Sequence, residues 1–132
     1  MTISSRCLAG FFLSLASAVA VAHHSFAVHY DGDRIVSVSG VVEEFRFRNP
    51  HGMIRITGAS ADGAEGTWTI ETNSPNILKR RGWAEDSISV GDEVVVEGFP
   101  ANDGSLAMRV YRIRFADGRE LIGQRPAAGL ER

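Results

Sequence analysis

Short segments with the residue pattern of β-strands recur along this chain, and they constrain its fold more than any other feature. Residues 34–48, 53–57 and 67–71 alternate between apolar and polar side chains, with the period of two that a half-buried strand shows. Residues 93–99 and 106–115 are predicted as two further strands, and turn-forming residues separate the segments. The chain is therefore predicted to be mostly β.

The first of these strands contains a glycine at which the alternation changes. The apolar residues lie on one parity before the change and on the other after it: Val36 and Val38, then Val41, Phe45 and Phe47. The change occurs at Gly40, and a glycine at such a position suggests a β-bulge that bends a long strand. We therefore expect the first strand to turn a corner at Gly40, as strands of small barrels do.

One short helix is predicted between the third and fourth strands. Ser74 followed by Pro75 is typical of a helix start, and Gly82 is a typical stop, so residues 75–81 should be helical. Three strands, a short helix and two strands are the plan of a five-stranded OB-like barrel. A curled antiparallel sheet with one helix is the alternative. Trp68 and Trp83 are expected in the core, whereas Glu71 is expected to face water.

The first 22 residues have the features of a cleavable secretory signal. Arg6 supplies a positive start, residues 8–21 form an apolar stretch, and Ala-Val-Ala at residues 20–22 fits the cleavage rule. The stretch is shorter than the ~20 residues that a membrane-spanning helix needs. We therefore expect residues 1–22 to be removed during export to the periplasm or the exterior, leaving no membrane span. Cleavage after Ala20 is the alternative.

The remaining 132 − 22 = 110 residues suffice for one domain. Residues 23–123 should form the barrel, and residues 124–132 a flexible C-terminal tail. The formal net charge of −2 gives no field that would gather polyanions, so a nucleic acid is not an expected partner. Cys7, the only cysteine, lies in the export segment, so the mature protein should contain neither a disulfide nor a catalytic thiol.

All four histidines fall in the N-terminal part of the chain: His23, His24, His29 and His51. If cleavage follows Ala22, the α-amine and the ring of His23 can chelate one metal ion, and His24 adds a second imidazole. Nitrogen-rich ligand sets of this kind suit Cu(II). The sequence therefore predicts a copper or other transition-metal site at His23 and His24, to which His51 contributes from the folded domain. The competing interpretation is that these histidines are ordinary polar residues of a terminus and a turn.

Three arginines suggest a different function. Arg46, Arg48 and Arg55 could lie together on the first hairpin and bind a small anionic ligand or an exported protein partner. The alternative is a solvated surface balanced by nearby glutamates. Neither a nucleophile elbow around serine nor a histidine–carboxylate motif on a helix is present, so the sequence does not predict an enzyme.

The chain resembles a family of small exported bacterial proteins known as domain of unknown function 6152. The resemblance is carried by these stretches: Ala22-His23-His24-Ser25-Phe26, Asn49-Pro50-His51, Trp68-Thr69-Ile70-Glu71, Ser74-Pro75-Asn76, Arg80-Arg81-Gly82-Trp83, Gly98-Phe99-Pro100-Ala101 and Asp103-Gly104-Ser105. It implies an exported domain and places His23, His24 and His51 within family motifs. It implies no activity, and this chain departs from the family pattern at His29.

Overall fold

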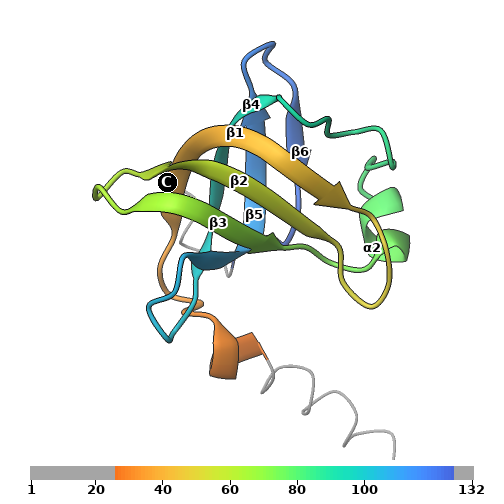
Figure 1. The fold of residues 1–132 in the computed structure, drawn as a ribbon. Coiled ribbons are helices and arrows are strands. Elements are labelled where there is room, and N and C mark those ends of the chain that lie inside the picture. The colour runs from red at the N-terminus through yellow and green to blue at the C-terminus, as the bar shows by residue number, and fades with distance from the viewer. Residues whose placement is uncertain (1–25, 127–132) are drawn as a thin grey trace, which may run out of the picture.

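A computed structural model describes residues 26–126 of the 132-residue chain (Figure 1). A single helical turn at residues 26–29 precedes the first strand. The labelled elements then follow in this order: β1 (Val36–Arg46), β2 (Met53–Ser60), β3 (Glu65–Glu71), α2 (Pro75–Lys79), β4 (Glu93–Pro100), β5 (Ala107–Phe115) and β6 (Glu120–Ile122). Within the described residues, no helix has the length and apolar character needed to cross a lipid bilayer.

The strands form one closed barrel. Their order is β3-β2-β1-β4-β5-β6, with antiparallel neighbours throughout, and β3 also pairs with β5 in parallel. This last pairing closes five strands into a barrel and leaves β6 as an extra strand on β5 (Figure 1). The prediction of a five-stranded OB-like barrel with one short helix between the third and fourth strands is therefore confirmed, and the open curled sheet is excluded.

The barrel interior contains the apolar residues that alternate along the strands. Examples with no exposed surface are Val38, Ile54, Ile70 and Val96. Both tryptophans are buried, as predicted, and the indole N–H of Trp83 donates a hydrogen bond of 2.9 Å to the carbonyl of Ile122. Burial of apolar surface is the main driving force of folding. The segments predicted from alternating apolar residues therefore form strands, because each places its apolar side chains in the barrel core.

The predicted bulge at Gly40 is wrong. The buried parity continues from Val38 through Gly40 to Val42, and the register shift comes afterwards, between Val42 and Glu44. Val41, which we expected to face inward, is 43% exposed. The irregularity in β1 therefore lies between Val42 and Glu44 and not at Gly40.

Gly40 has a different role, which is to allow close approach between strands. It lies opposite Gly58 of β2, and Gly58 in turn lies opposite Gly66 of β3. A Cβ atom on Gly58 would come within 2.1 Å of the carbonyl oxygen of Ser39. The three glycines form a row across β1, β2 and β3, and a Cβ atom on Gly40 or Gly58 would collide with the backbone of the neighbouring strand.

The helix is shorter than predicted because it ends at Lys79 instead of continuing to residue 81. Pro75 occupies its start, although the Ser74 side chain makes no capping hydrogen bond. Gly82 has a φ of +86°, a conformation that favours glycine, and the amide of Trp83 donates to the carbonyl of Leu78. The chain therefore leaves the helical conformation by Gly82, the glycine that the sequence indicated as the stop.

Candidate functional site

A cavity of about 780 Å³ opens where β3 ends and α2 begins. Its walls come from the N-terminal helical turn, the β1–β2 loop, the β3–α2 connection, the start of β5 and the chain after β6. We call it the end cavity, and its lining residues are Phe26, His29, Tyr30, Pro50, His51, Glu71, Asn73, Ser74, Ile77, Arg109 and Gln124. Five separate segments of the chain therefore meet at this place.

The carboxylate of Glu71 is the centre of a polar network in the end cavity. The Tyr30 hydroxyl donates to Glu71 Oε2 at 2.5 Å, and Arg109 Nη1 donates to Glu71 Oε1 at 2.5 Å. His51 Nδ1 also contacts Glu71 Oε1. The expectation that Glu71 faces water is therefore incomplete, since its two oxygens contact three side chains from three other segments.

Arg109 joins this network from β5. It lies opposite Glu71 in the β3–β5 pairing, and only 8% of its surface is exposed. Its Nη2 donates to Asn73 Oδ1 at 2.5 Å, while its buried Nε has no hydrogen-bond partner among residues 26–126. Burial lowers the pKa of Arg109, and the Glu71 carboxylate opposes that shift. Charge pairing with Glu71 offsets part of the cost of placing a guanidinium here.

Tyr30 acts as a hydrogen-bond donor in this network. Burial and the hydrogen bond to Glu71 raise the pKa of the Tyr30 hydroxyl well above its usual value. The phenol therefore remains protonated and can keep donating to the carboxylate. Its ring also stacks near Phe26, with 5.7 Å between centroids.

Removing the Tyr30 hydroxyl should measurably destabilise the protein. A Tyr30→Phe substitution keeps the ring but takes one donor from a charged acceptor, which is expected to lower the free energy of unfolding by about 1–2 kcal/mol. Urea denaturation measures the change. Tyr111→Phe is the matched control, because the Tyr111 hydroxyl makes no hydrogen bond within the described part of the chain. Equal stability of the two variants would contradict the network.

The backbone next to His51 is held against the end of β3. The amide of Gly52 donates to the carbonyl of Asn73 at 3.3 Å, and the amide of Thr72 donates to the carbonyl of Gly52 at 2.9 Å. These contacts bring the β1–β2 loop beside Glu71. The His51 side chain nevertheless stays 51% exposed, so its ring has one side on Glu71 and another open to solvent.

The N-terminal turn is tied to the barrel by both rings and hydrogen bonds. Phe26 packs edge-on against Phe99, with 5.5 Å between ring centroids. Asn102 Nδ2 donates to the carbonyls of Ala27 and Val28 at 2.9 and 3.2 Å, and the Asn102 amide donates to the carbonyl of His29. The chain therefore enters the described structure at the wall of the end cavity.

The predicted metal residues are placed only in part. His51 lines the end cavity, and so does His29, whereas His23 and His24 lie outside the described residues. Among residues 26–126, no group of three or more His, Cys, Asp or Glu side chains could hold a metal ion. The folded part of the chain thus offers His51 and its carboxylate partner but not a complete metal site.

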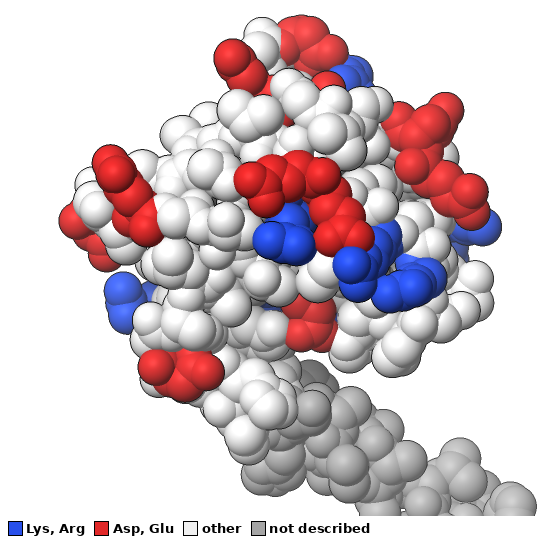
Figure 2. Space-filling model, in the orientation of Figure 1, with Lys and Arg blue, Asp and Glu red and all other residues white. Residues whose placement is uncertain are grey.

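The three predicted arginines lie outside the end cavity. Arg46 pairs with Glu44, and Arg55 lies 3.8 and 3.9 Å from carboxylate oxygens of Glu43 and Glu44. Figure 2 shows acidic and basic side chains side by side on this face of the molecule. Arg48 is exposed and makes no ion pair with another described residue. Two of the three positive charges are therefore balanced locally.

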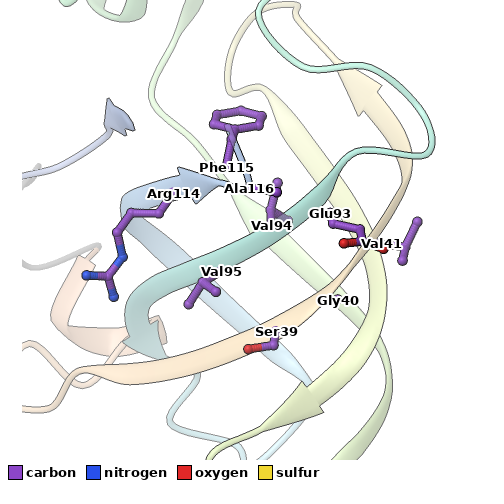
Figure 3. Close-up of a pocket in the computed structure, with 9 residues that line it drawn as sticks. All are labelled: Ser39, Gly40, Val41, Glu93, Val94, Val95, Arg114, Phe115 and Ala116. Carbon is purple, nitrogen blue, oxygen red and sulfur yellow. The ribbon is translucent and has the colours of Figure 1, made fainter. Parts of the chain in front are cut away.

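A second hollow of about 430 Å³ lies on the outer barrel wall over β1, β4 and β5. Figure 3 shows small and apolar side chains such as Ser39, Val41 and Val95 along it, with Glu93 and Arg114 at opposite ends. The Arg114 guanidinium donates to Glu97 at 2.6 Å. The groove gathers no cluster of titratable or metal-binding groups, so the end cavity is the better candidate site.

Sequence reasoning identified His51 but missed Tyr30, Glu71 and Arg109. Glu71 and Arg109 were hard to find because each occupies the polar parity of its strand, where a solvated charge is the ordinary expectation. Tyr30 lies 41 residues from Glu71 in the sequence and contacts it only after the chain folds, so no local pattern pointed to this contact.

A family model described as "Family of unknown function (DUF6152)" matches residues 11–109. The match contains every residue that lines the end cavity except Gln124. No curated protein and no solved structure matches the chain.

Proposed function

Since the chain belongs to the DUF6152 family, whose function is unknown, its function has to be argued from its own residues, and we propose that it is an exported copper-binding protein. In this proposal, His23 and His24 at the processed N-terminus bind the metal ion together with His51. Export to the periplasm or the exterior is part of the same proposal, because cleavage creates the free amine beside His23.

The observation that carries this proposal is the contact between His51 Nδ1 and Glu71 Oε1. In the neutral ring, the nitrogen that faces a carboxylate oxygen carries the proton, and the other nitrogen, Nε2, keeps its lone pair. Metal-binding histidines commonly donate their second ring N–H to a carboxylate, which fixes the tautomer and raises the basicity of the ligand. Glu71 is itself held by Tyr30 and Arg109, so His51 has the support that a metal ligand needs.

The tethered N-terminal turn supports the contribution of His23 and His24. Phe26 lines the same cavity as His51. His24 precedes Phe26 by two residues and His23 by three, so their Cα atoms lie within about 7 and 11 Å of that of Phe26, whatever the path of the chain. Such distances bring the imidazoles and the new amine within reach of the cavity that His51 lines.

The donor set explains the choice of metal. One amine and up to three imidazoles supply nitrogen ligands and no thiolate, since Cys7 would leave with the signal. Nitrogen sets accept the square-planar arrangement that Cu(II) prefers, and Cu(II) binds most tightly among the divalent first-row metals. The role of this chain's residues would be to hold and orient the ion.

Mass spectrometry of the exported protein, followed by metal analysis of the same sample, tests the proposal. We expect a chain that starts at His23 and binds one Cu(II) per molecule, because the chelate requires the free amine next to a histidine ring. A chain that starts at Phe26, or one that starts at His23 and takes up no stoichiometric copper, would overturn it.

Binding of an anionic ligand or an exported protein at Arg46, Arg48 and Arg55 is the alternative proposal. Its support is Arg48, which is exposed and makes no ion pair within residues 26–126. In that case copper titration would show no binding, while an Arg48→Ala variant would fail to retain a partner that the unmodified protein captures. The two proposals therefore give opposite results in the same pair of assays.

A further inference from the structure

The end cavity is larger than a metal ion requires. Its volume of about 780 Å³ lies within the range of roughly 300–1,000 Å³ found for small-molecule sites. Phe26, Pro50 and Ile77 give it an apolar wall, and polar groups from β3, β5 and the β3–α2 connection occupy the rest. Apolar walls with a few converging polar groups are the usual composition of a ligand site.

Two polar groups of the cavity, on Asn73 and Ser74, have hydrogen-bond donors that are unused within the described part of the chain. Among residues 26–126, Glu71 is the only carboxylate in the lining, and its oxygens already contact Tyr30, His51 and Arg109. Asn73 Oδ1 accepts from Arg109, which orients the amide and leaves its nitrogen without a partner among the described residues. The Ser74 hydroxyl makes no capping bond to α2. A ligand that matches these groups must bring acceptors.

The local charge also favours an acceptor that is negative. Arg109 is buried behind Asn73, and its Nε has no hydrogen-bond partner within residues 26–126. Arg81 is close enough for its charge to lower the Arg109 pKa. Among the described residues that line the cavity, Glu71 is the one carboxylate and it already pairs with Arg109, so an anion would meet no unpaired negative group there.

We propose that the end cavity binds a small organic acid with an apolar body. Its carboxylate accepts hydrogen bonds from the Asn73 amide nitrogen and the Ser74 hydroxyl, with the charge of Arg109 behind them. The apolar body packs against Phe26, Pro50 and Ile77. The two donors proposed for the carboxylate, the Asn73 amide nitrogen and the Ser74 hydroxyl, make no hydrogen bond to His51 or Glu71, so binding of the acid can be measured in the absence of copper.

The test is a calorimetric and NMR titration of the purified protein after removal of metal with EDTA. Acetate, hexanoate, 1-hexanol and inorganic phosphate are the probes. We expect saturable binding of hexanoate that is tighter than that of acetate, because the longer chain buries more apolar surface on the wall. Neither 1-hexanol, which lacks the charge, nor phosphate, which lacks the apolar body, should match it.

An Asn73→Asp variant tests the polar end of the site. Aspartate still offers an oxygen to Arg109, so the fold is retained, but it removes the amide donor and adds a repelling charge. We expect hexanoate affinity to fall by about tenfold or more. Asn76→Asp is the matched control, since it introduces the same charge at an exposed position of α2 that does not line the cavity. It should bind hexanoate like the unmodified protein.

Three results would overturn the proposal. They are the absence of saturable binding by any acid, equal binding by the Asn73→Asp and unmodified proteins, and phosphate binding as tight as that of hexanoate. Because the titration is done without metal, a negative result leaves the copper proposal untouched, and a failure of copper binding leaves this one untouched.

Discussion

A Glu71→Gln substitution is expected to weaken Cu(II) binding by about 10- to 100-fold, although residue 71 is not proposed to touch the metal ion. Glutamine keeps the shape of the side chain and one acceptor oxygen, so one of the two donors, Arg109 or Tyr30, loses its acceptor. The substitution also removes the negative charge that makes His51 Nδ1 the protonated nitrogen and Nε2 the ligand. We therefore expect weaker metal binding together with a lower free energy of unfolding, so the affinity is measured under conditions in which the variant is folded.

Competition titration against a copper chelator of known affinity measures this loss. His51→Ala should weaken binding further, because it removes the ligand itself. Glu43→Gln is the matched control, since Glu43 is exposed on β1 outside the end cavity, where it accepts a hydrogen bond from the Thr57 hydroxyl and lies 3.8 Å from Arg55. If Glu43→Gln weakened copper binding as much as Glu71→Gln, the effect would be one of overall charge. If Glu71→Gln bound copper normally, Glu71 would have no part in orienting His51.

The second large effect is expected at Gly58, where an alanine should destabilise the barrel by about 3 kcal/mol. Its Cβ would lie 2.1 Å from the carbonyl oxygen of Ser39 and 2.7 Å from the Cα of Gly40. Both are backbone atoms, so relief requires β1 and β2 to separate where they hydrogen-bond. Thermal unfolding should show a melting temperature lower by more than about 10 °C.

Gly63→Asn is the control for this prediction. Gly63 lies in the turn that joins β2 to β3, with a φ of +93° and no atom within 4 Å of an added Cβ. Asparagine tolerates positive φ better than most residues, so only a small loss is expected. A Gly58→Ala variant that melted at the same temperature as Gly63→Asn would show that the strands do not need the glycine row.

The strands and the helix could be predicted because each depends on residues close together in the sequence. Trp68 and Ile70 alternate with polar neighbours, and Ser74-Pro75 and Gly82 mark the two ends of the helical segment. The bend in β1 could not be located in this way. The parity of Val38 and Phe45 requires a shift somewhere between them, and Gly40 was the plausible place until its contact with Gly58 was known.

The candidate site was predictable only at His51. Its partner Glu71 has the sequence context of a solvated strand residue, and Arg109 has the same context on β5. Tyr30 gave no local signal at all. Their meeting requires the parallel pairing of β3 with β5 and the tethering of the N-terminal turn, neither of which is encoded in a short segment. The copper ligands His23 and His24 and the export signal stay predictions.

The amino-acid sequence by itself determined the mostly β class, the order of the elements and most residues of the core, although not the side on which Val41 lies. These properties follow from local alternation and turn chemistry, which act over a few residues. Only the tertiary structure decided where β1 bends and which charges surround His51. Both depend on contacts between residues far apart in the chain, whose energies exist only once the barrel has closed and brought Gly40 to Gly58 and Arg109 to Glu71.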